Sequence, residues 1–452
     1  MSSRSHPMRR RKPVPARELA LQILAAAESR KAYADRLLES RLRDAALAPR
    51  DAAFVTTLVL GTLRHRALLD HHLEAFLGPR WEGIPPWIRE ALRIGAFQML
   101  VLTRVPASAA VAESVELAKK YGHPGTAGLV NAVLRRLAGG DRAPLPDGDP
   151  VGRLAILHSH PRWIAERWVA RYGAEEAERL LAADNAEPRV TVRANATRIG
   201  TEALREALRA EGAEAVPGPN GGPTLVLSEG FVAARSRLFR DGLLSLQDEA
   251  EAVVVALLAL APGARGLDLC AAPGGKTSQM VEAVSPGGFV VAVERHPSRA
   301  RALRENLVAR LRLGRVSVVA ADARRPPLGG PFDGVLVDAP CSGLGVLRRR
   351  ADARWRKGEE TIVEMAALQG PILEAAAGLV GPGGSLVYSV CSLEPEETDR
   401  IVEAFLKRHD EFALDDARPR LPAAFRGEGP ELRAMPHRHG TDGVFAARLV
   451  RR

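Results

Sequence analysis

The sequence predicts a multidomain protein with an all-α N-terminal domain, a small α+β middle domain and a C-terminal α/β domain with a Rossmann-like, doubly wound sheet. Three observations predict this arrangement: helical periodicity without a convincing strand in the first third, mixed patterns after a Gly/Pro-rich linker, and five short apolar runs towards the C-terminus. A chain of 452 residues also exceeds one hydrophobic core. We therefore expect domains over 1–140, 153–242 and 243–452.

The N-terminal domain is predicted to consist of several short helices. Over residues 16–138, apolar positions such as Leu21, Leu24 and Leu38 recur at helical spacing, and Pro and Gly residues mark the breaks. Residues 139–152, GGDRAPLPDGDPVG, are dense in Gly, Pro and Asp. This composition is typical of a linker between domains.

The middle domain is predicted to begin with a helix over 161–183 and to continue as mixed α/β structure. VTVRAN alternates like a half-buried strand, TEALREALRAEG has the pattern of an amphipathic helix, and PTLVLSEG ends the unit as another strand. These patterns indicate a small α+β domain.

The C-terminal domain is predicted from apolar runs that suit buried parallel strands: GLDLC, FVVAVE, VSVVAAD, FDGVLVD and SLVYSVC. Helical segments or long connections separate the runs, as in a doubly wound sheet. The runs end in the polar or reactive residues Cys270, Glu294, Asp322, Asp338 and Cys391. Because ligands bind outside the carboxyl ends of such strands, we expect these side chains to converge on one crevice.

The composition favours some classes of function and argues against others. The formal net charge of +10 favours a polyanionic partner such as nucleic acid. No apolar stretch reaches the roughly 18 residues of a membrane span, and three cysteines without a C-x-x-C pair argue against a disulfide framework and a metal site. The Arg-rich start lacks a secretory apolar segment, so we expect a basic tail on a cytoplasmic protein, with a transit peptide as the alternative.

A glycine-rich turn, AAPGGKTSQM, follows the first strand and opens a helix. Gly274 and Gly275 let the backbone approach a ligand, and the helix N-terminus offers unpaired N–H groups. Two interpretations compete. C-A-A-P-G-G-K-T matches a P-loop except for Cys270 at the first glycine, which would indicate a nucleotide hydrolase. Glu294, at the end of the next strand, instead favours an adenosine ribose, and Asp322 is placed to accept from an adenine amine.

Several motifs resemble a known family. DLCAAPGGKT, DAPCSG, the later VCS-x-x-PEE and the closing HGTDGVFAARL resemble S-adenosylmethionine-dependent RNA cytosine-5 methyltransferases. Towards the N-terminus, PRDAAFVTTLVLGTLRHRALLD, RVPASAAVAESVELAKK and GLVNAVLRRL resemble the NusB-like domain that is fused to the bacterial 16S ribosomal RNA members. The resemblance covers nearly the full chain.

The resemblance implies S-adenosylmethionine as cofactor. It places the methionine and ribose part against Cys270, Ala271, Ala272, Pro273, Gly274, Gly275 and Lys276. It further implies that Glu294 binds the ribose, that Asp322 lies on the adenine side, and that Asp338 lies between cofactor and base. Two positions depart from the family. Glu294 stands where Asp is frequent, and Val390 stands where Thr usually precedes the cysteine, so that hydroxyl is missing.

Methylation of cytosine carbon 5 requires a nucleophile, because this carbon does not attack a methyl sulfonium unaided. A thiolate that adds to carbon 6 turns the ring into a reactive enamine. By resemblance, Cys391 attacks and Cys341 assists proton removal or product release; the alternative for both is burial as small apolar residues. A helix expected near Pro395 could stabilise the thiolate. If Asp338 is protonated, it could donate a hydrogen bond to cytosine N3. The alternative is that Asp338 caps the turn before Pro340.

RNA contacts are expected from LRRRADARWRK, residues 347–357, which contain six basic residues and Trp355. Arg binds phosphates and Trp stacks on unpaired bases, whereas the alternative is a solvated helix face with a core Trp. Weaker candidates are Arg135, Arg136 and the tail from Arg9 to Lys12. His71 and His72 are expected to be ordinary surface or satisfied residues and not metal ligands.

The expected function is thus methylation of carbon 5 of an unpaired or flipped cytosine in RNA, with 16S ribosomal RNA as the expected substrate. We expect a monomer in which the two N-terminal domains select the RNA. The alternative from another class is a NusB-like RNA-binding or assembly factor whose methyltransferase domain is inactive. A P-loop hydrolase is the third hypothesis.

Overall fold

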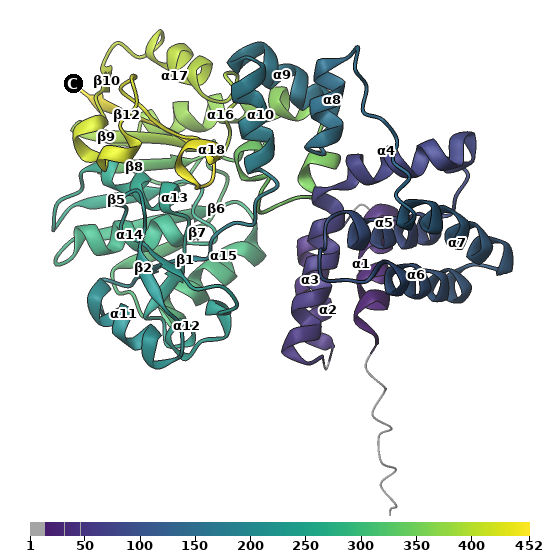
Figure 1. Ribbon diagram of the computed structural model, residues 1–452. Helices are drawn as coiled ribbons and strands as arrows, with labels where there is room; N and C mark the ends of the chain where they lie inside the picture. Colours follow the sequence, from purple (N-terminus) through teal and green to yellow (C-terminus); the bar gives the residue numbers. More distant parts are fainter. Residues whose placement is uncertain (1–13, 31, 46) are drawn as a thin grey trace, which may run out of the picture. The chain divides into compact units, whose positions relative to one another are not determined.

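Residues 14–30, 32–45 and 47–452 are described in the computed structural model, whose chain divides into two units (Figure 1). The first unit comprises the chain up to residue 185 together with residues 350–356. The second unit comprises residues 186–349 and 357–452. The tail from Arg9 to Lys12, a candidate for RNA binding, lies outside the described residues.

Helices form the N-terminal part of the first unit, as the sequence predicts. They are α1 (Ala16–Arg30), α2 (Ala34–Asp44), α3 (Pro49–Arg64), α4 (Arg66–Leu77), α5 (Pro86–Leu100), α6 (Ala107–Tyr121) and α7 (Pro124–Ala138), with the 3-10 turn η1 (Gly78–Trp81). Proline starts α3, α5 and α7, where its missing N–H has no intrahelical partner to lose. The buried faces share one core that contains Leu21, Leu58, Ile94 and Leu134. Among the described residues, no helix combines the length and apolar character of a membrane span.

Three further helices complete the first unit: α8 (Pro150–Leu157), α9 (Arg162–Tyr172) and α10 (Ala174–Ala183). The Asp149 carboxylate caps α8 by accepting from the backbone N–H of Gly152 at 2.9 Å. The single helix predicted over 161–183 is wrong in one respect. Gly173 adopts a φ of 81°, which breaks the segment into α9 and α10.

The second unit begins with a small α+β domain. Its elements are β1 (Thr191–Ala194), α11 (Thr201–Ala210), β2 (Ala215–Pro217), β3 (Leu225–Leu227), η2 (Ala233–Arg235), α12 (Arg237–Arg240) and β4 (Leu244–Leu246). The strands form an antiparallel sheet in the order β2-β3-β1-β4. Leu204 and Leu208 of α11 pack with Val192 of β1 in its core. The domain limits 1–140, 153–242 and 243–452 stay a prediction.

The rest of the second unit contains a mixed sheet in the order β10-β12-β9-β8-β5-β6-β7, with β11 on β12. Its strands are β5 (Arg265–Asp268), β6 (Phe289–Glu294), β7 (Val316–Ala320), β8 (Phe332–Asp338), β9 (Val380–Val390), β10 (Phe412–Asp415), β11 (Leu432–Ala434) and β12 (Val444–Arg451). The five strands predicted to be parallel are β7, β6, β5, β8 and β9, and they are parallel. The sheet continues with antiparallel strands, which the sequence did not predict.

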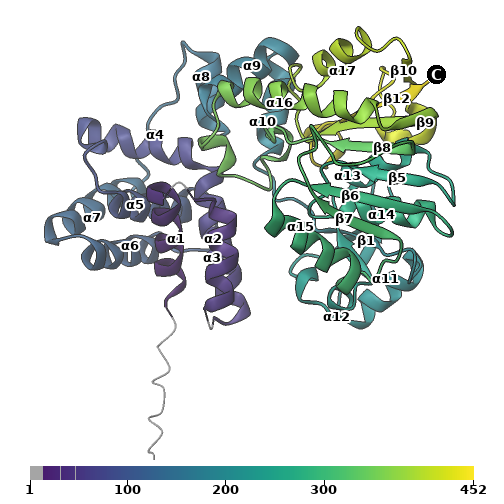
Figure 2. The same cartoon turned by 180° about the vertical axis from the view of Figure 1, so that it is seen from behind.

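Helices cover both faces of this sheet, which explains why its central strands are largely apolar. They are α13 (Glu249–Val254), α14 (Gly275–Val284), α15 (Pro297–Arg304), α16 (Glu359–Ala377), α17 (Asp399–Leu406) and α18 (Pro436–His439). Helix α14 lies in front of the sheet in Figure 1, whereas α16 lies in front when the view is reversed in Figure 2. Met280 of α14 and Ile372 of α16 belong to two separate buried clusters. In a sheet covered on both faces, ligands bind at the carboxyl ends of the strands. We call these strand ends the open edge of the domain.

Candidate active site

Two free thiols meet at the carboxyl ends of β8 and β9. Cys341 lies shortly after β8 and Cys391 directly follows β9, and these two strands are parallel neighbours. Their Sγ atoms are 3.1 Å apart. A disulfide bond has a length of about 2.05 Å, so the pair is in the dithiol form. The structure thus brings together the two cysteines that the resemblance singled out.

The surroundings of Cys391 favour its protonated form. The hydrogen bond with Cys341 and burial raise the pKa of Cys391 well above its usual value, and Asp338 adds to this effect. Lys276 acts in the opposite direction. The helix expected near Pro395 begins only at Asp399, so that part of the prediction is wrong and no helix N-terminus directly follows the thiol.

Asp338, the last residue of β8, is held by two neighbours. Its Oδ2 accepts from Lys276 Nζ at 2.8 Å, and its Oδ1 accepts from Ser389 Oγ at 2.6 Å. Lys276 also forms an ion pair with Glu251. The role of Asp338 at cytosine N3 stays a prediction. Glu251 and Ser389 escaped the sequence analysis, because neither stands in a recognisable motif.

Glu397 joins the two cysteine turns. Its Oε1 accepts from the backbone N–H of Ser342 at 2.6 Å, and its Oε2 accepts from the hydroxyls of Ser342 and Ser392, each at 2.5 Å. Glu397 is fully buried, and Gln369 Nε2 also donates to its Oε1 at 3.1 Å. The sequence signal is that each cysteine is followed by a serine, in DAPCSG and in VCSLEPEE.

The glycine-rich turn connects β5 to α14. Cys270, Ala271, Ala272 and Pro273 lie in this turn, and Gly274, Gly275 and Lys276 begin α14. Gly274 has a φ of 106°, and a Cβ there would lie 2.7 Å from Leu303, so the position requires glycine. At Gly275 a Cβ would meet nothing closer than 3.7 Å, which leaves room for a ligand against the backbone. Burial raises the pKa of Cys270 well above its usual value, so this third thiol is protonated.

Two carboxylates stand at the ends of the neighbouring strands. Glu294, the last residue of β6, is buried, and it accepts from the backbone N–H of His296 at 2.9 Å and lies 3.3 Å from Arg299 Nη2. Asp322 follows β7, and hydrogen bonds from Arg324 hold its pKa below the usual range. Both positions match the sequence prediction, because β5, β6 and β7 are adjacent and parallel. With the glycine turn they form one edge that suits an adenosine with a charged tail.

Residues 347–357 are predicted to bind RNA, and the structure contradicts this prediction at Arg354. Arg354 is fully buried in the first unit, where Nη1 donates to Ser159 O at 3.0 Å and to Asn185 Oδ1 at 2.8 Å. The indole N–H of Trp355 donates to Leu63 O at 2.8 Å. These contacts leave Arg354 unavailable to a phosphate. Trp355 is only partly buried, so its stacking on an RNA base stays a prediction.

Arg348 and Arg349, which precede Arg354, also form ion pairs or hydrogen bonds within the protein. Arg349 Nη2 lies 2.7 Å from Asp248, and its Nε lies 2.6 Å from Asp442. Buried Arg348 donates to Thr441 O at 3.1 Å. Only Arg350 and Arg356 of this segment are exposed. The basic residues that the sequence assigned to RNA thus serve mainly to fix the segment.

The remaining candidates have ordinary partners. His71 Nε2 lies 3.0 Å from Pro144 O, and His72 Nδ1 accepts from the backbone N–H of Ala143 at 3.1 Å. Arg135 donates to Asn131 Oδ1, and Arg136 forms an exposed ion pair with Asp141 at 3.0 Å. In the described part of the chain, no group of three or more His, Cys, Asp or Glu residues could hold a metal ion.

The fold and the strand-end residues define a Rossmann-like domain of the methyltransferase class, with a thiol pair at the carboxyl ends of two parallel strands. Residues 255–450 match the family model described as 16S rRNA methyltransferase RsmB/F. Residues 14–139 match the NusB family, and residues 160–233 match the ferredoxin-like domain of RsmF/B-like proteins.

Known proteins resemble the chain over nearly its full length. A putative methyltransferase, Rv1407, of Mycobacterium tuberculosis is 40% identical and covers 100% of both chains. The probable ribosomal RNA small subunit methyltransferase B of Bacillus subtilis is 35% identical over 96% of this chain and 98% of its own. The crystal structure of PH0851 superposes with a TM-score of 0.81 at 26% identity, covering 97% of this chain and 100% of that one.

The chain belongs to the RsmB/F family of ribosomal RNA methyltransferases, with NusB-like, ferredoxin-like and methyltransferase domains. The family uses S-adenosylmethionine as its cofactor, as the sequence predicted. The glycine turn is accordingly not a P-loop. The expected fold class is confirmed as well, with the ferredoxin-like fold giving the middle α+β domain its specific form.

Proposed function

We propose that the protein methylates carbon 5 of a cytosine in 16S ribosomal RNA through a transient bond between Cys391 Sγ and carbon 6 of the base. The observation that carries this proposal is the Cys391–Cys341 pair, with 3.1 Å between its sulfurs, beside the ion pair of Asp338 and Lys276. A methyl transfer to a nitrogen or oxygen would need no such pair, because those atoms carry lone pairs of their own.

The residues of the open edge fit S-adenosylmethionine. Cys270 to Lys276 would hold its methionine and ribose part, Glu294 the ribose hydroxyls and Asp322 the adenine side, and Asp338 would lie between cofactor and base. The bound cofactor supplies an electrophilic methyl group. Glu294 can serve because its carboxylate is already oriented by the backbone N–H of His296.

The chain's own residues account for the remaining steps. Cys391 loses its proton and its thiolate adds to carbon 6 of the cytosine, which makes carbon 5 nucleophilic enough to take the methyl group. A base then removes the proton from carbon 5, and the thiolate leaves as the carbon 5–carbon 6 double bond re-forms. Cys341 stands where it can assist this proton removal or the release of product. Because Cys391 starts protonated, we expect the rate to rise with pH.

The other parts of the chain are assigned to substrate selection. We propose three domains, 1–140, 153–242 and 243–452, of which the first two select the RNA. An unpaired or flipped cytosine is required, since carbon 6 is not reachable inside a helix. The protein would act as a monomer in the cytoplasm, where ribosomal RNA is available to it.

Two cysteine variants test the proposal under reducing conditions. Cys391→Ala should bind S-adenosylmethionine with unchanged affinity, as measured by calorimetry, yet transfer no tritiated methyl group to RNA. Cys341→Ala should instead accumulate a covalent protein–RNA adduct that survives denaturing electrophoresis, because release is impaired. Val387→Ala, which removes a buried side chain from the strand that carries Cys391, is the control for loss of buried volume.

Three outcomes would contradict the proposal. Full methyl transfer by Cys391→Ala would remove the nucleophile from the scheme. Transfer by the wild type to a position other than carbon 5, seen by bisulfite sequencing and mass spectrometry of the RNA, would refute the cytosine-5 assignment. A wild type that binds RNA without any transfer would instead favour an assembly factor with an inactive methyltransferase domain.

A further inference from the structure

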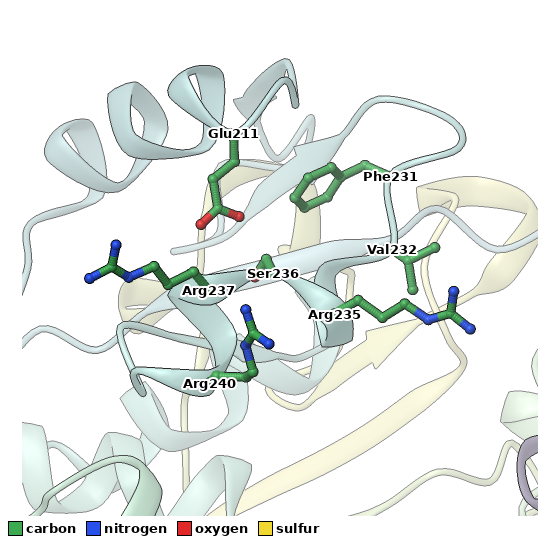
Figure 3. A pocket seen from close by; sticks show the side chains of 7 residues that line it. All are labelled: Glu211, Phe231, Val232, Arg235, Ser236, Arg237 and Arg240. Atoms are coloured by element: carbon green, nitrogen blue, oxygen red, sulfur yellow. The ribbon is translucent and has the colours of Figure 1, made fainter. Parts of the chain in front are cut away.

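A hollow in the ferredoxin-like domain lies outside the residues assigned to methyl transfer. It has a volume of about 450 Å³ and is lined by Glu211, Phe231, Val232, Arg235, Ser236, Arg237 and Arg240. In Figure 3, Glu211 and Phe231 lie on one side of the hollow, and Arg237 and Arg240 lie on the other. Sites for small ligands measure about 300–1,000 Å³, so the hollow has the size for one nucleotide.

Three arginines give this hollow an excess of positive charge. Arg235 and Arg240 are exposed, and within the described part of the chain neither side chain makes an ion pair or a hydrogen bond. Arg237 is paired with Asp241 at 3.2 Å, and both side chains are exposed. An exposed pair of this kind contributes at most about 1 kcal/mol, so Arg237 can exchange its partner for a phosphate.

The backbone that carries these arginines is fixed. Ser236 Oγ accepts from the backbone N–H of Phe239 at 3.0 Å and so caps α12. Arg310 Nη1 donates to Phe239 O at 3.0 Å and to Leu244 O at 2.9 Å. Its guanidinium also lies over the Phe239 ring, at 4.2 Å from the centroid. The arginines of the hollow therefore project from a rigid base, which lowers the entropic cost of binding.

Apolar and acidic groups complete the hollow in a pattern that a bare phosphate would not require. Val232 exposes 53% of its surface, and the neighbouring Phe231 is partly exposed. An aromatic ring beside arginines is the combination on which unpaired RNA bases stack. Glu211, on the side away from Arg237 and Arg240, can accept from a ribose hydroxyl or an exocyclic amine.

We propose that this hollow binds one unpaired nucleotide of the RNA substrate, with its phosphate on Arg235 and Arg240 and its base against Phe231. The inference rests on the proposed function for the identity of the partner, an RNA, and not for the chemistry of methyl transfer. The hollow thereby gives the ferredoxin-like domain a defined role in holding single-stranded RNA.

The test measures binding of a fluorescently labelled single-stranded RNA by anisotropy over a series of salt concentrations. The double variant Arg235→Ala/Arg240→Ala should bind roughly tenfold more weakly or worse, and the slope of log K against log salt should shrink by about 0.7, because the contact with one phosphate of a single strand is lost. Phe231→Ala should weaken binding without changing the salt slope, because stacking releases no counterions. Arg209→Ala removes an exposed arginine of α11 that does not line the hollow, so it is the control for loss of charge.

Failure of this inference is separable from failure of the proposed function. Wild-type affinity in the double variant, or an equal loss in the Arg209→Ala control, would overturn the inference whatever the RNA chemistry; a protein partner would then be the better occupant. Absence of cytosine methylation by the wild type would overturn the proposed function, and the anisotropy series would still decide the role of the hollow. At saturating RNA the double variant should keep the wild-type kcat, with only KM raised.

Discussion

Glu397 links the two cysteine turns through their serines. A buried carboxylate is stable only when its oxygens are hydrogen-bonded, and here four donors from three segments satisfy them. The turns after β8 and β9 are consequently fixed relative to each other, which keeps the two sulfurs in contact. Glu397 is thus committed to a structural link between the two turns.

Replacement of this carboxylate should impair turnover more than cofactor binding. In Glu397→Gln an amide nitrogen replaces one acceptor oxygen, so at least one serine turn loses a charge-assisted hydrogen bond. We expect kcat for methyl transfer to fall by roughly tenfold to a hundredfold, while the affinity for S-adenosylmethionine stays unchanged. Glu403→Gln, an exposed substitution on α17, is the control. An unchanged kcat would show that Glu397 does not position the thiols.

Asp268 gives the methyltransferase domain a pH-dependent stability. Burial raises the pKa of Asp268 from an ordinary 3.8 to about 7, although Thr277 Oγ1 donates to it at 2.7 Å. A carboxyl with a raised pKa stabilises the fold fully below its unfolded pKa and loses this contribution as the pH rises through the folded pKa. The wild type should thus lose stability relative to Asp268→Asn between about pH 4 and about pH 7.

The pKa difference of Asp268 sets an upper bound on the change in the free energy of unfolding. The pKa difference of about 3 at roughly 1.4 kcal/mol per unit gives roughly 4 kcal/mol. Thermal unfolding of both proteins across this pH range provides the measurement, with Asp333→Asn as the control for an exposed carboxyl on the same sheet. Parallel melting curves for wild type and Asp268→Asn at every pH would contradict the expectation.

Motif residues could be predicted from the sequence, whereas their supporting partners could not. Cys341, Asp338 and Cys391 stand at the ends of recognisable strands, and parallel strands place such ends together. Glu251 contacts Lys276 only because α13 and α14 pack side by side. No periodicity encodes such a contact between elements.

At the scale of elements, burial on both faces decided which strands could be predicted. The central parallel strands are largely apolar, and their runs stand out in the sequence. The outer strands β10 and β11 are short and only partly buried, so their runs are too weak to separate from loops. Strand β12 was recognised only as a family motif, and its antiparallel pairing with β9 is a property of the tertiary fold.

The segment after the Cys341 turn shows how composition can mislead. Arginine-rich stretches usually lie in solvent, and a tryptophan beside them suggests base stacking. In the structure Arg354 reaches three main-chain or amide oxygens, and Asp352 accepts from the backbone N–H of Ala34 at 2.8 Å. Buried arginine requires such a set of acceptors, and these come from residues more than a hundred positions away in the chain.

On the scale of the whole molecule, the chain passes between its two units three times. It leaves the helical unit after residue 185, returns for residues 350–356 and leaves again at residue 357. Within the helical unit, Ala351 belongs to the hydrophobic core, and Arg356 donates to Ala32 O at 2.6 Å. Residues 350–356, which lie shortly after the Cys341 turn, are thereby built into the helical unit.

This connectivity predicts that the NusB-like part stays attached when the linker is cut. A protease site inserted at residues 141–148 should be cleaved readily, because most of this stretch is exposed. The two fragments should nevertheless co-elute on size-exclusion chromatography, since residues 350–356 of the second fragment and helices α8 to α10 remain packed in the helical unit. The variant Asp352→Ala should weaken this association, because it leaves the backbone N–H of Ala34 in the first fragment without its buried acceptor, whereas Arg350→Ala should not. Separation of the wild-type fragments, or equal association in Asp352→Ala and Arg350→Ala, would mean that the segment does not hold the two parts of the chain together.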